Sequence, residues 1–214
     1  LDDQLKLGDD SPDGEILLHN KGRVQRTIVI EDRSWLGEVL TAERVTTMQA
    51  FRDLFSDQVL RPGDEITIRN ISFVFTDLVD STKLFENIGD AAAYQLVREH
   101  YAILGEVVRK HDGTIVKTRG DGIHAAFLTP ETALLASIEI QQAIEQFNNE
   151  SSSVPIRIRI GINSGSSISV NMNDRLDYYG KTVNFAARLE GQGGAGEITM
   201  SREFAEDPAV AEIL

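Results

Sequence analysis

FVFTDLVDST, residues 73–82, and GTIVKTRGDGIHAAF, residues 113–127, are the two stretches of the sequence that decide its fold. In the first, an apolar run predicts a buried strand that stops at Asp77. In the second, β-branched and apolar residues on both sides of a Gly-Asp-Gly turn predict a hairpin with Asp121 at its tip. When these strands lie side by side, both carboxylates reach the same edge of the sheet.

The two aspartates are predicted to hold divalent cations, because carboxylate and phosphate oxygens are the ligands that hard cations such as Mg²⁺ take. Each aspartate alone has a simpler interpretation. Asp77 would cap a helix at a strand-to-helix junction, and Asp121 would supply a turn residue that tolerates positive φ. Their combination at one sheet edge favours the metal site.

Three motifs resemble those of the class III nucleotidyl cyclases, the adenylate and guanylate cyclase family, and they occur in the order found there: FTDLVDST (75–82), KTRGDG (117–122) and LDYYGKTVNFAARLE (176–190). The resemblance runs from about residue 71 to residue 201. It implies an α+β catalytic domain with a ferredoxin-like, palm-like sheet. It also implies an adenylate cyclase, a phosphorus-oxygen lyase that converts ATP to 3′,5′-cyclic AMP and pyrophosphate.

The resemblance further implies how the phosphates are handled. Asp77 and Asp121 would hold two divalent cations, Mg²⁺ or Mn²⁺, in a two-metal phosphoryl transfer. Asn184 and Arg188, four residues apart, would share one face of a helix. Asn184 would orient the ribose, and Arg188 would stabilise the charge on the phosphorus in the transition state.

Lys117 and Asp177 would read the base. Adenine offers an acceptor at N1 and a donor at its N6 amine, and a lysine with an aspartate supplies the matching donor and acceptor. Cyclases for GTP carry Glu and a small residue such as Cys at these places, so the pair favours ATP. The loop expected around residue 177 varies in length, and Asp174 is the alternative to Asp177.

In the family, the metal aspartates come from one subunit and the remaining site residues from the other. Because this chain carries all six residues, the resemblance implies a homodimer with two shared sites.

Three residues depart from the family pattern. Asp80 stands where glycine is common, and Arg119 and His124 stand where apolar residues are common. The interpretation of His124 is a tolerated edge-strand residue rather than a ligand.

Composition limits the alternatives. With 214 residues and 41% hydrophobic content, the chain can bury one sizeable core and a small appendage. The net charge of −13 argues against a binder of nucleic acid or anionic membranes and disfavours a polymerase of palm-like fold. The absence of cysteine fits a cytoplasmic protein. No apolar run in the sequence approaches the roughly 18 residues of a spanning helix.

Residues 1–68 are expected to be the end of an upstream regulatory domain and a linker helix, and residues 69–214 the catalytic domain without its last strands. The start at Leu1 resembles a piece of a longer protein with an upstream sensor. A hairpin is predicted over residues 15–31 and a helix over residues 41–56. The apolar stripe of that helix comprises Val45, Met48, Phe51 and Phe55. It would either couple the sensor to the catalytic domain or simply pack on the hairpin.

Within the catalytic domain, periodicity predicts helices on one face of a sheet. The helices are expected from residue 82 and over residues 91–110, 130–148 and 181–190, and the later strands over residues 114–118, 123–127, 156–162, 166–172 and 197–200. Asp177 is expected in the loop after the strand that ends at residue 172.

Two other functions remain open. A guanylate cyclase would differ in the residues that read the base. A degenerate cyclase-like module that only binds nucleotide as a regulatory device would have lost a metal aspartate, the asparagine or the arginine, and all are present here.

Overall fold

The computed structural model describes most of the chain beyond its first 39 residues, namely residues 40–55, 60, 64–150, 154–173 and 175–214. The chain divides into two units between Val39 and Leu40. All of the described residues belong to the second unit. The hairpin predicted over residues 15–31 therefore lies outside them, and so does any packing of the helix over 41–56 on that hairpin.

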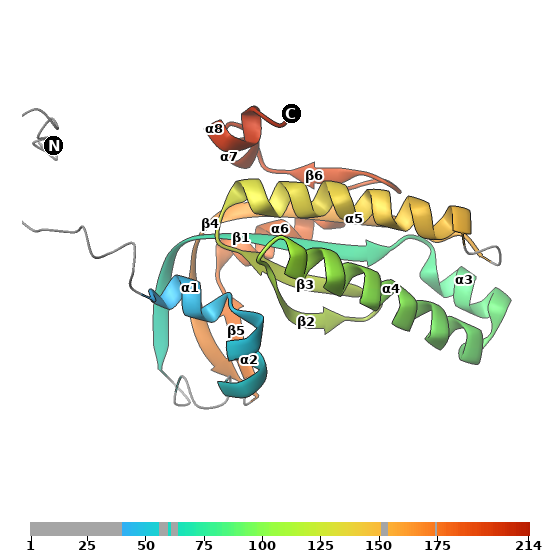
Figure 1. Cartoon of the computed structure of the whole chain (residues 1–214), viewed down its shortest axis with the longest axis horizontal. Helices are drawn as coiled ribbons and strands as arrows, with labels where there is room; N and C mark the ends of the chain where they lie inside the picture. Colours follow the sequence, from blue (N-terminus) through green and yellow to red (C-terminus); the bar gives the residue numbers. More distant parts are fainter. Residues whose placement is uncertain (1–39, 56–59, 61–63, 151–153, 174) are drawn as a thin grey trace, which may run out of the picture. The chain divides into compact units, whose positions relative to one another are not determined.

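The described residues form one six-stranded sheet (Figure 1). Its strands are β1 (Glu65–Leu78), β2 (Thr114–Arg119), β3 (Gly122–Phe127), β4 (Ile158–Met172), β5 (Arg175–Tyr179) and β6 (Ile198–Met200). Five of them follow the order β2-β3-β1-β4-β5 with antiparallel neighbours, and β6 pairs in parallel with β4. Strands β2 and β5 are thus the outer strands of the main path.

Helices pack on this mainly antiparallel sheet, which confirms the α+β class. They are α1 (Ala42–Thr46), α2 (Gln49–Phe55), α3 (Ser81–Ile88), α4 (Asp90–Lys110), α5 (Pro130–Glu150), α6 (Lys181–Glu190), α7 (Arg202–Ala205) and α8 (Pro208–Ala211). Helices α3 to α6 and the hairpin of β2 and β3 lie close to their predicted bounds. In the part of the chain that the structure describes, no helix is both long enough and apolar enough to cross a bilayer.

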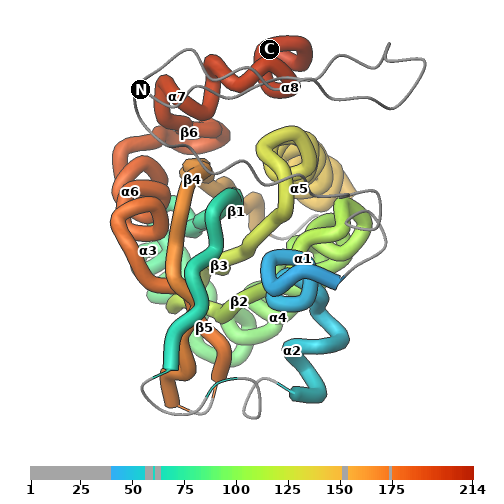
Figure 2. Tube along the Cα trace, turned by 90° about the vertical axis from the view of Figure 1, so that its left-hand side faces the viewer, coloured from blue at the N-terminus to red at the C-terminus, as the bar shows by residue number. Residues whose placement is uncertain are grey.

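The side chains of β1 alternate between two hydrophobic clusters, one on each face of the sheet. Val74 belongs to the cluster that includes residues of α4 and α5. Phe73 and Phe75 belong to the opposite cluster, which includes Val183 and Ala186 of α6. Figure 2 shows α4 and α5 on one side of the sheet and α6 on the other. The prediction that the helices share one face is therefore wrong for α6.

Two strands are longer than the sequence predicts. Strand β1 begins at Glu65, well before the predicted strand that stops at Asp77, and it has a register shift between Ile68 and Ile71. Strand β4 runs without a break through the glycine- and serine-rich residues 161–167, where the sequence predicts a gap. The reason is that the β1–β4 ladder extends along nearly the whole of both strands, so backbone pairing continues where local propensity is weak.

The predicted helix over residues 41–56 is broken, and its buried face is polar. The Oγ1 atoms of Thr46 and Thr47 donate to the carbonyls of Ala42 and Glu43 at 2.8 and 3.0 Å, as hydroxyls do where they compete with helix bonds. Met48 and Phe55, two members of the apolar stripe, are 43% and 46% exposed. The stripe therefore does not form the buried side; Thr46, Thr47 and Arg52 are buried instead.

His124 lies in the interior of the sheet, which corrects its interpretation as an edge residue. Strand β3 has β1 on one side and β2 on the other. The imidazole is fully buried and stacks on Phe75, with 4.3 Å between the ring centroids.

Asp80, another departure from the family pattern, has φ of 57°, a conformation that glycine adopts most easily.

Gly161 of β4 lets α6 approach the sheet, and we expect Gly161→Ala to destabilise the domain. A Cβ atom there would lie 2.1 Å from the Glu190 nitrogen and 2.5 Å from the Ala186 carbonyl oxygen, both backbone atoms of α6. The expected loss is about 1–3 kcal/mol in the free energy of unfolding, measured by urea denaturation.

Gly191→Ala is the matched control, because Gly191 has φ of −65° and its Cβ would come no nearer than 3.7 Å to a neighbour, the Arg188 carbonyl. Its unfolding midpoint should stay near that of the parent protein. Equal stability of the two variants would contradict the close approach of α6 to β4.

Candidate active site

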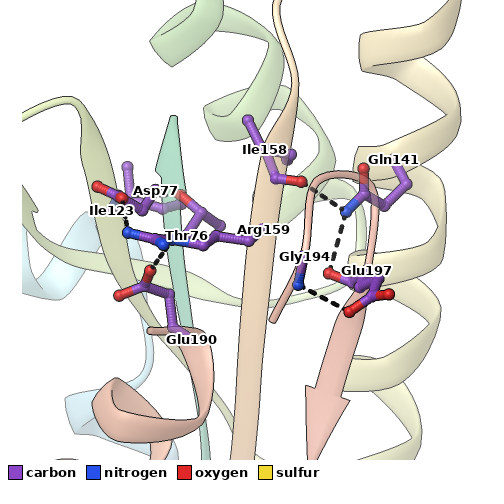
Figure 3. A network of polar contacts seen from close by, with 9 residues as sticks. All are labelled: Thr76, Asp77, Ile123, Gln141, Ile158, Arg159, Glu190, Gly194 and Glu197. Carbon is purple, nitrogen blue, oxygen red and sulfur yellow. Dashed lines mark hydrogen bonds and ion pairs between the residues drawn. The ribbon is translucent and has the colours of Figure 1, made fainter. Parts of the chain in front are cut away.

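The turn between β2 and β3 abuts the end of β1, and this contact places Asp121 beside Asp77. A Cβ atom on Gly122 would lie 1.7 Å from the Thr76 carbonyl oxygen, so only glycine fits. The backbone nitrogen of Ile123 donates to Thr76 Oγ1 at 3.1 Å (Figure 3). These contacts fix the turn against the strand that carries Asp77.

The carboxyl groups of Asp77 and Asp121 are neighbours in the structure. Burial raises the pKa of Asp77 above its ordinary value, and the adjacent Asp121 raises it further, while Arg159 opposes both effects. Two carboxylates held this close repel each other unless a cation or a proton intervenes.

Arg159 of β4 is a site residue that the sequence analysis did not identify. It lies opposite Asp77 in the β1–β4 register, and its Nη2 contacts Asp77 Oδ2 at 2.5 Å. Its Nε forms an ion pair of 2.6 Å with Oε1 of Glu190, at the end of α6 (Figure 3). In IRIRIGIN, residues 156–163, the alternation places Arg159 on the face opposite the isoleucines, but nothing in this pattern indicates a carboxylate on the neighbouring strand.

Glu190 is a second residue of this site, and no sequence motif marks it as functional. Its side chain is buried, and burial together with the nearby Asp77 raises its pKa, while Arg159 lowers it. Arg159 therefore lies between two acidic side chains and compensates part of their charge. In the sequence Glu190 was only the last residue of the third motif.

Helix α4 supports the turn that carries Asp121 from the other side. Tyr101 Oη donates to the carbonyl oxygen of Gly120 at 2.6 Å. His100 is fully buried beside the backbone of Asp121. The turn is thus held at Gly120 by α4 and at Gly122 by β1.

The carboxylate pair fits a Mg²⁺ or Mn²⁺ site that the substrate completes. Among the described residues, no group of three or more His, Cys, Asp or Glu side chains could enclose a metal ion. Mg²⁺ is commonly bound by one or two carboxylates together with substrate phosphates and water. Asp77 and Asp121 supply that number of protein ligands.

Lys117 and Asp177 meet at a second place, where the two outer strands of the sheet approach each other. Lys117 Nζ lies 2.5 Å from Asp177 Oδ2, and Asp177 Oδ1 accepts from the backbone nitrogen of Tyr178 at 2.8 Å. Asp177 belongs to β5, which corrects its expected place in a loop. Residue 174, the alternative, lies outside the described residues.

Asn184 and Arg188 share the exposed face of α6, as their spacing predicts. The helix is tied to β4 near its start, where Thr182 Oγ1 donates to the Ser166 carbonyl at 2.6 Å and Asn163 Nδ2 donates to the Thr182 carbonyl at 3.2 Å. The two polar side chains are therefore presented on a fixed helix, and both remain open to solvent.

The described residues form three separate pairs of predicted site residues rather than one cluster. The pairs are Asp77 with Asp121, Lys117 with Asp177, and Asn184 with Arg188. No hydrogen bond or ion pair among the described residues joins Asp77 or Asp121 to the other four predicted site residues, Lys117, Asp177, Asn184 and Arg188. A single chain therefore presents a carboxylate pair at one end of β1 and a lysine–aspartate pair between β2 and β5.

The family profile of the adenylate and guanylate cyclase catalytic domain matches residues 65–207. The chain belongs to this family. The match includes all six predicted site residues and confirms the resemblance stated for the three motifs. Helices α1 and α2 precede it.

Three similar proteins illustrate the relationship. Adenylate cyclase 1 of Rhizobium meliloti (strain 1021) is 33% identical over 137 residues, which cover 58% of this chain and 21% of that protein. The adenylyl cyclase CyaB from P. aeruginosa has a TM-score of 0.61 at 25% identity, with 70% of this chain and 84% of that chain covered. The guanylyl cyclase Cya2 has a TM-score of 0.63 at 24% identity, with 70% and 81% covered.

These likenesses confirm the predicted fold of a class III cyclase catalytic domain. The matched part of this chain spans about a fifth of the Rhizobium protein. The fold is shared about equally with an adenylyl and a guanylyl cyclase, so the choice of nucleotide depends on individual side chains.

His124 lies opposite Lys117 in the β2–β3 register and should make stability depend on pH. Burial lowers its pKa from 6.5 to about 3; Asp177 opposes this effect, and the positive charges of Lys117, Arg52 and Arg119 add to it. Neither ring nitrogen has a hydrogen-bond partner among the described residues. Below pH 6.5 the unfolded chain gains a proton at this position that the folded chain does not take up, so stability falls as the pH falls.

We expect the His124→Leu variant to lose about 1.4 kcal/mol less stability than the parent protein between pH 7.5 and pH 5.5. Urea denaturation at the two pH values measures the difference. Above pH 7 the two proteins should show parallel pH profiles, because the imidazole is then neutral in both states. An identical loss in both proteins on acidification would show that His124 is not the group responsible.

Proposed function

We propose that this protein is an adenylate cyclase that converts ATP to 3′,5′-cyclic AMP and pyrophosphate in a homodimer. The observation that carries the proposal is the contact of Lys117 Nζ with Asp177 Oδ2 at 2.5 Å. It places one donor and one acceptor side by side, as the N1 and N6 positions of adenine require. Guanine presents the reverse pattern at the equivalent atoms.

Asp77 and Asp121 would bind the two divalent cations, Mg²⁺ or Mn²⁺, together with the triphosphate. When bound, the cations supply charge neutralisation and a lowered pKa for the ribose 3′-hydroxyl. Arg159 holds the Asp77 carboxylate in position and adds a positive charge at this end of the sheet. The chain itself therefore provides alignment and charge, which phosphoryl transfer needs more than covalent help.

Asn184 would hold the ribose so that its 3′-oxygen faces the α-phosphorus. Arg188 would donate to the phosphate oxygens whose negative charge changes as pyrophosphate leaves. A guanidinium suits this task because it stays charged and presents a planar set of donors. The exposure of both side chains on α6 leaves them free to meet a nucleotide held by another subunit.

A twofold dimer would join the two separate places. One subunit would contribute its carboxylate pair, and its partner would contribute the base-reading pair and the exposed face of α6. Phe185, between Asn184 and Arg188 in the sequence, is 45% exposed, which suits a helix face covered by another subunit. We also propose that residues 69–214 form the catalytic domain, that residues 1–68 carry regulation from an upstream sensor, and that the enzyme acts in the cytoplasm, where ATP is available.

The reaction itself gives one test of the proposed function. The purified protein, incubated with ATP and Mg²⁺ or Mn²⁺, should form cyclic AMP faster than it forms cyclic GMP from GTP. Asp77→Asn should reduce this rate by at least about 100-fold, because one metal ligand loses its charge. Product is measured by chromatography.

Asp80→Asn is the matched control, because Asp80 is an exposed carboxylate close in the sequence that pairs with Lys83 rather than with the site. Its rate should equal that of the parent protein. If Asp77→Asn formed product as fast as the parent, the metal assignment would be wrong. If a well-folded parent protein bound nucleotide without forming product under any of these conditions, it would be a nucleotide-binding module instead.

Sites formed between two subunits give another test of the proposed function. Asp77→Asn and Arg188→Ala should each be nearly inactive alone, but an equimolar mixture should recover about a quarter of the parent activity. Half of the dimers in a random mixture are mixed dimers, and each of these has one site with neither substitution. A mixture as inactive as its components, with subunit exchange demonstrated by a labelled chain, would contradict sites formed between subunits.

A further inference from the structure

We propose that Gln49 and Arg52 of helix α2 position the two side chains that read the base. This inference rests on the proposed role of Lys117 and Asp177. Helix α2 precedes residues 65–207, the part of the chain that matches the cyclase family. Both residues would therefore influence substrate choice from outside the matched domain.

Gln49 fixes the outer strand that carries Lys117. Its Oε1 accepts from the backbone nitrogen of Ile115 at 2.8 Å and from Thr114 Oγ1 at 2.9 Å. Strand β2 is an outer strand, so its outward N–H groups lack a neighbouring strand, and the glutamine takes that place for one of them.

The position of this contact matters because the β2–β3 register shifts between Ile115 and Lys117. An irregularity of this kind changes the direction in which the following side chain points. Gln49 therefore holds the backbone at the point that decides where Lys117 is aimed.

Arg52 fixes the residues on both sides of Asp177. Arg52 is 6% exposed, and its guanidinium donates to the carbonyl oxygens of Leu176 and, at 3.0 Å, Thr46. It also lies over the ring of Tyr178, with 5.4 Å from Cζ to the ring centroid. Tyr178 Oη donates to the same Thr46 carbonyl at 2.9 Å. Leu176 and Tyr178 are the two neighbours of Asp177 in the chain.

The two residues act from one helix face, because they are three positions apart. Through Gln49 the helix holds β2, and through Arg52 it holds β5, the strand at the other end of the main path. A cavity of about 690 Å³ lined by residues of α2, β2 and β5, including Lys117, lies at this junction. Dense packing therefore does not fill the junction, and these few polar contacts largely set the distance between the strands.

Substrate selectivity separates a positioning role from a purely structural one. A loss of stability lowers the amount of active protein and reduces turnover of ATP and GTP by the same factor. A displaced Asp177 or Lys117 impairs the reading of adenine and raises KM for ATP, whereas guanine presents its donor and acceptor in the reverse order and loses less when the pair moves. The ratio of kcat/KM for ATP to that for GTP is thus the decisive quantity.

We would test Arg52→Met and Gln49→Leu in the complete 214-residue chain, with Arg52→Lys as the conservative variant that keeps the charge. Arg44→Met is the matched control, since Arg44 is an exposed arginine of the neighbouring helix α1. We expect Arg52→Met and Gln49→Leu to lower the ATP-to-GTP ratio about tenfold, mainly through KM for ATP. Arg52→Lys should recover part of the loss, and Arg44→Met should equal the parent.

Arg52→Met could fail to fold, because it removes the buried donor that the Leu176 and Thr46 carbonyls share. Gln49→Leu and Arg52→Lys then still test the proposal, and competition between ATP and GTP for binding gives a second readout that needs no turnover. Folded Gln49→Leu and Arg52 variants that keep the parent ratio would overturn the inference.

The double exchange Lys117→Glu with Asp177→Cys is run in parallel and should shift preference toward GTP. If the double exchange shifts the preference toward GTP while the Arg52 and Gln49 variants keep the parent ratio of ATP to GTP, only the positioning role is refuted. No shift in the exchange variant refutes the base-reading assignment, and the positioning role fails with it.

Discussion

The pairing of β1 with a neighbouring strand on each side is the constraint on which the rest of the structure depends. Along its C-terminal half, Phe75 lies opposite His124 of β3, and Asp77 lies opposite Arg159 of β4. A strand held in this way cannot slip by one residue without exchanging the side chains that face its two hydrophobic clusters. The register therefore fixes Asp77 beside both the arginine and the turn that carries Asp121.

Charge at this end of the sheet is balanced locally, although the protein as a whole carries a net charge of −13. Arg159 lies between Asp77 and Glu190, and the adjacent Asp121 adds a further negative charge. Such a group of carboxylates favours cations, and a triphosphate would be received together with them. The net negative charge thus disfavours binding of extended polyanions such as nucleic acids. It does not decide whether a small anion binds together with metal ions.

The contacts of α2 connect the proposed substrate selection to the segment that precedes the family match. Arg52 and Leu176 are 124 positions apart in the sequence, yet the guanidinium donates directly to that carbonyl. A displacement of the helix would be transmitted to β5 and, through Gln49, to β2. Base recognition and control by upstream sequence would then depend on the same two polar side chains.

The sequence by itself determined the local elements and the residues that the family motifs mark. The turn around Asp121, the amphipathic α4 and α5, and the shared face of Asn184 and Arg188 follow from residues near each other in the chain. The tertiary structure alone decided that His124 and Arg52 are buried.

The tertiary structure also decided that Asp177 lies in a strand and that Arg159 contacts a carboxylate. The physical reason is that the burial and the partners of a side chain depend on which strands become neighbours. Polar groups can be buried wherever distant backbone atoms satisfy them. Hydrophobic periodicity therefore predicted the helices and strands, but it misassigned the buried face of α2, where main-chain carbonyls accept the donors of an arginine.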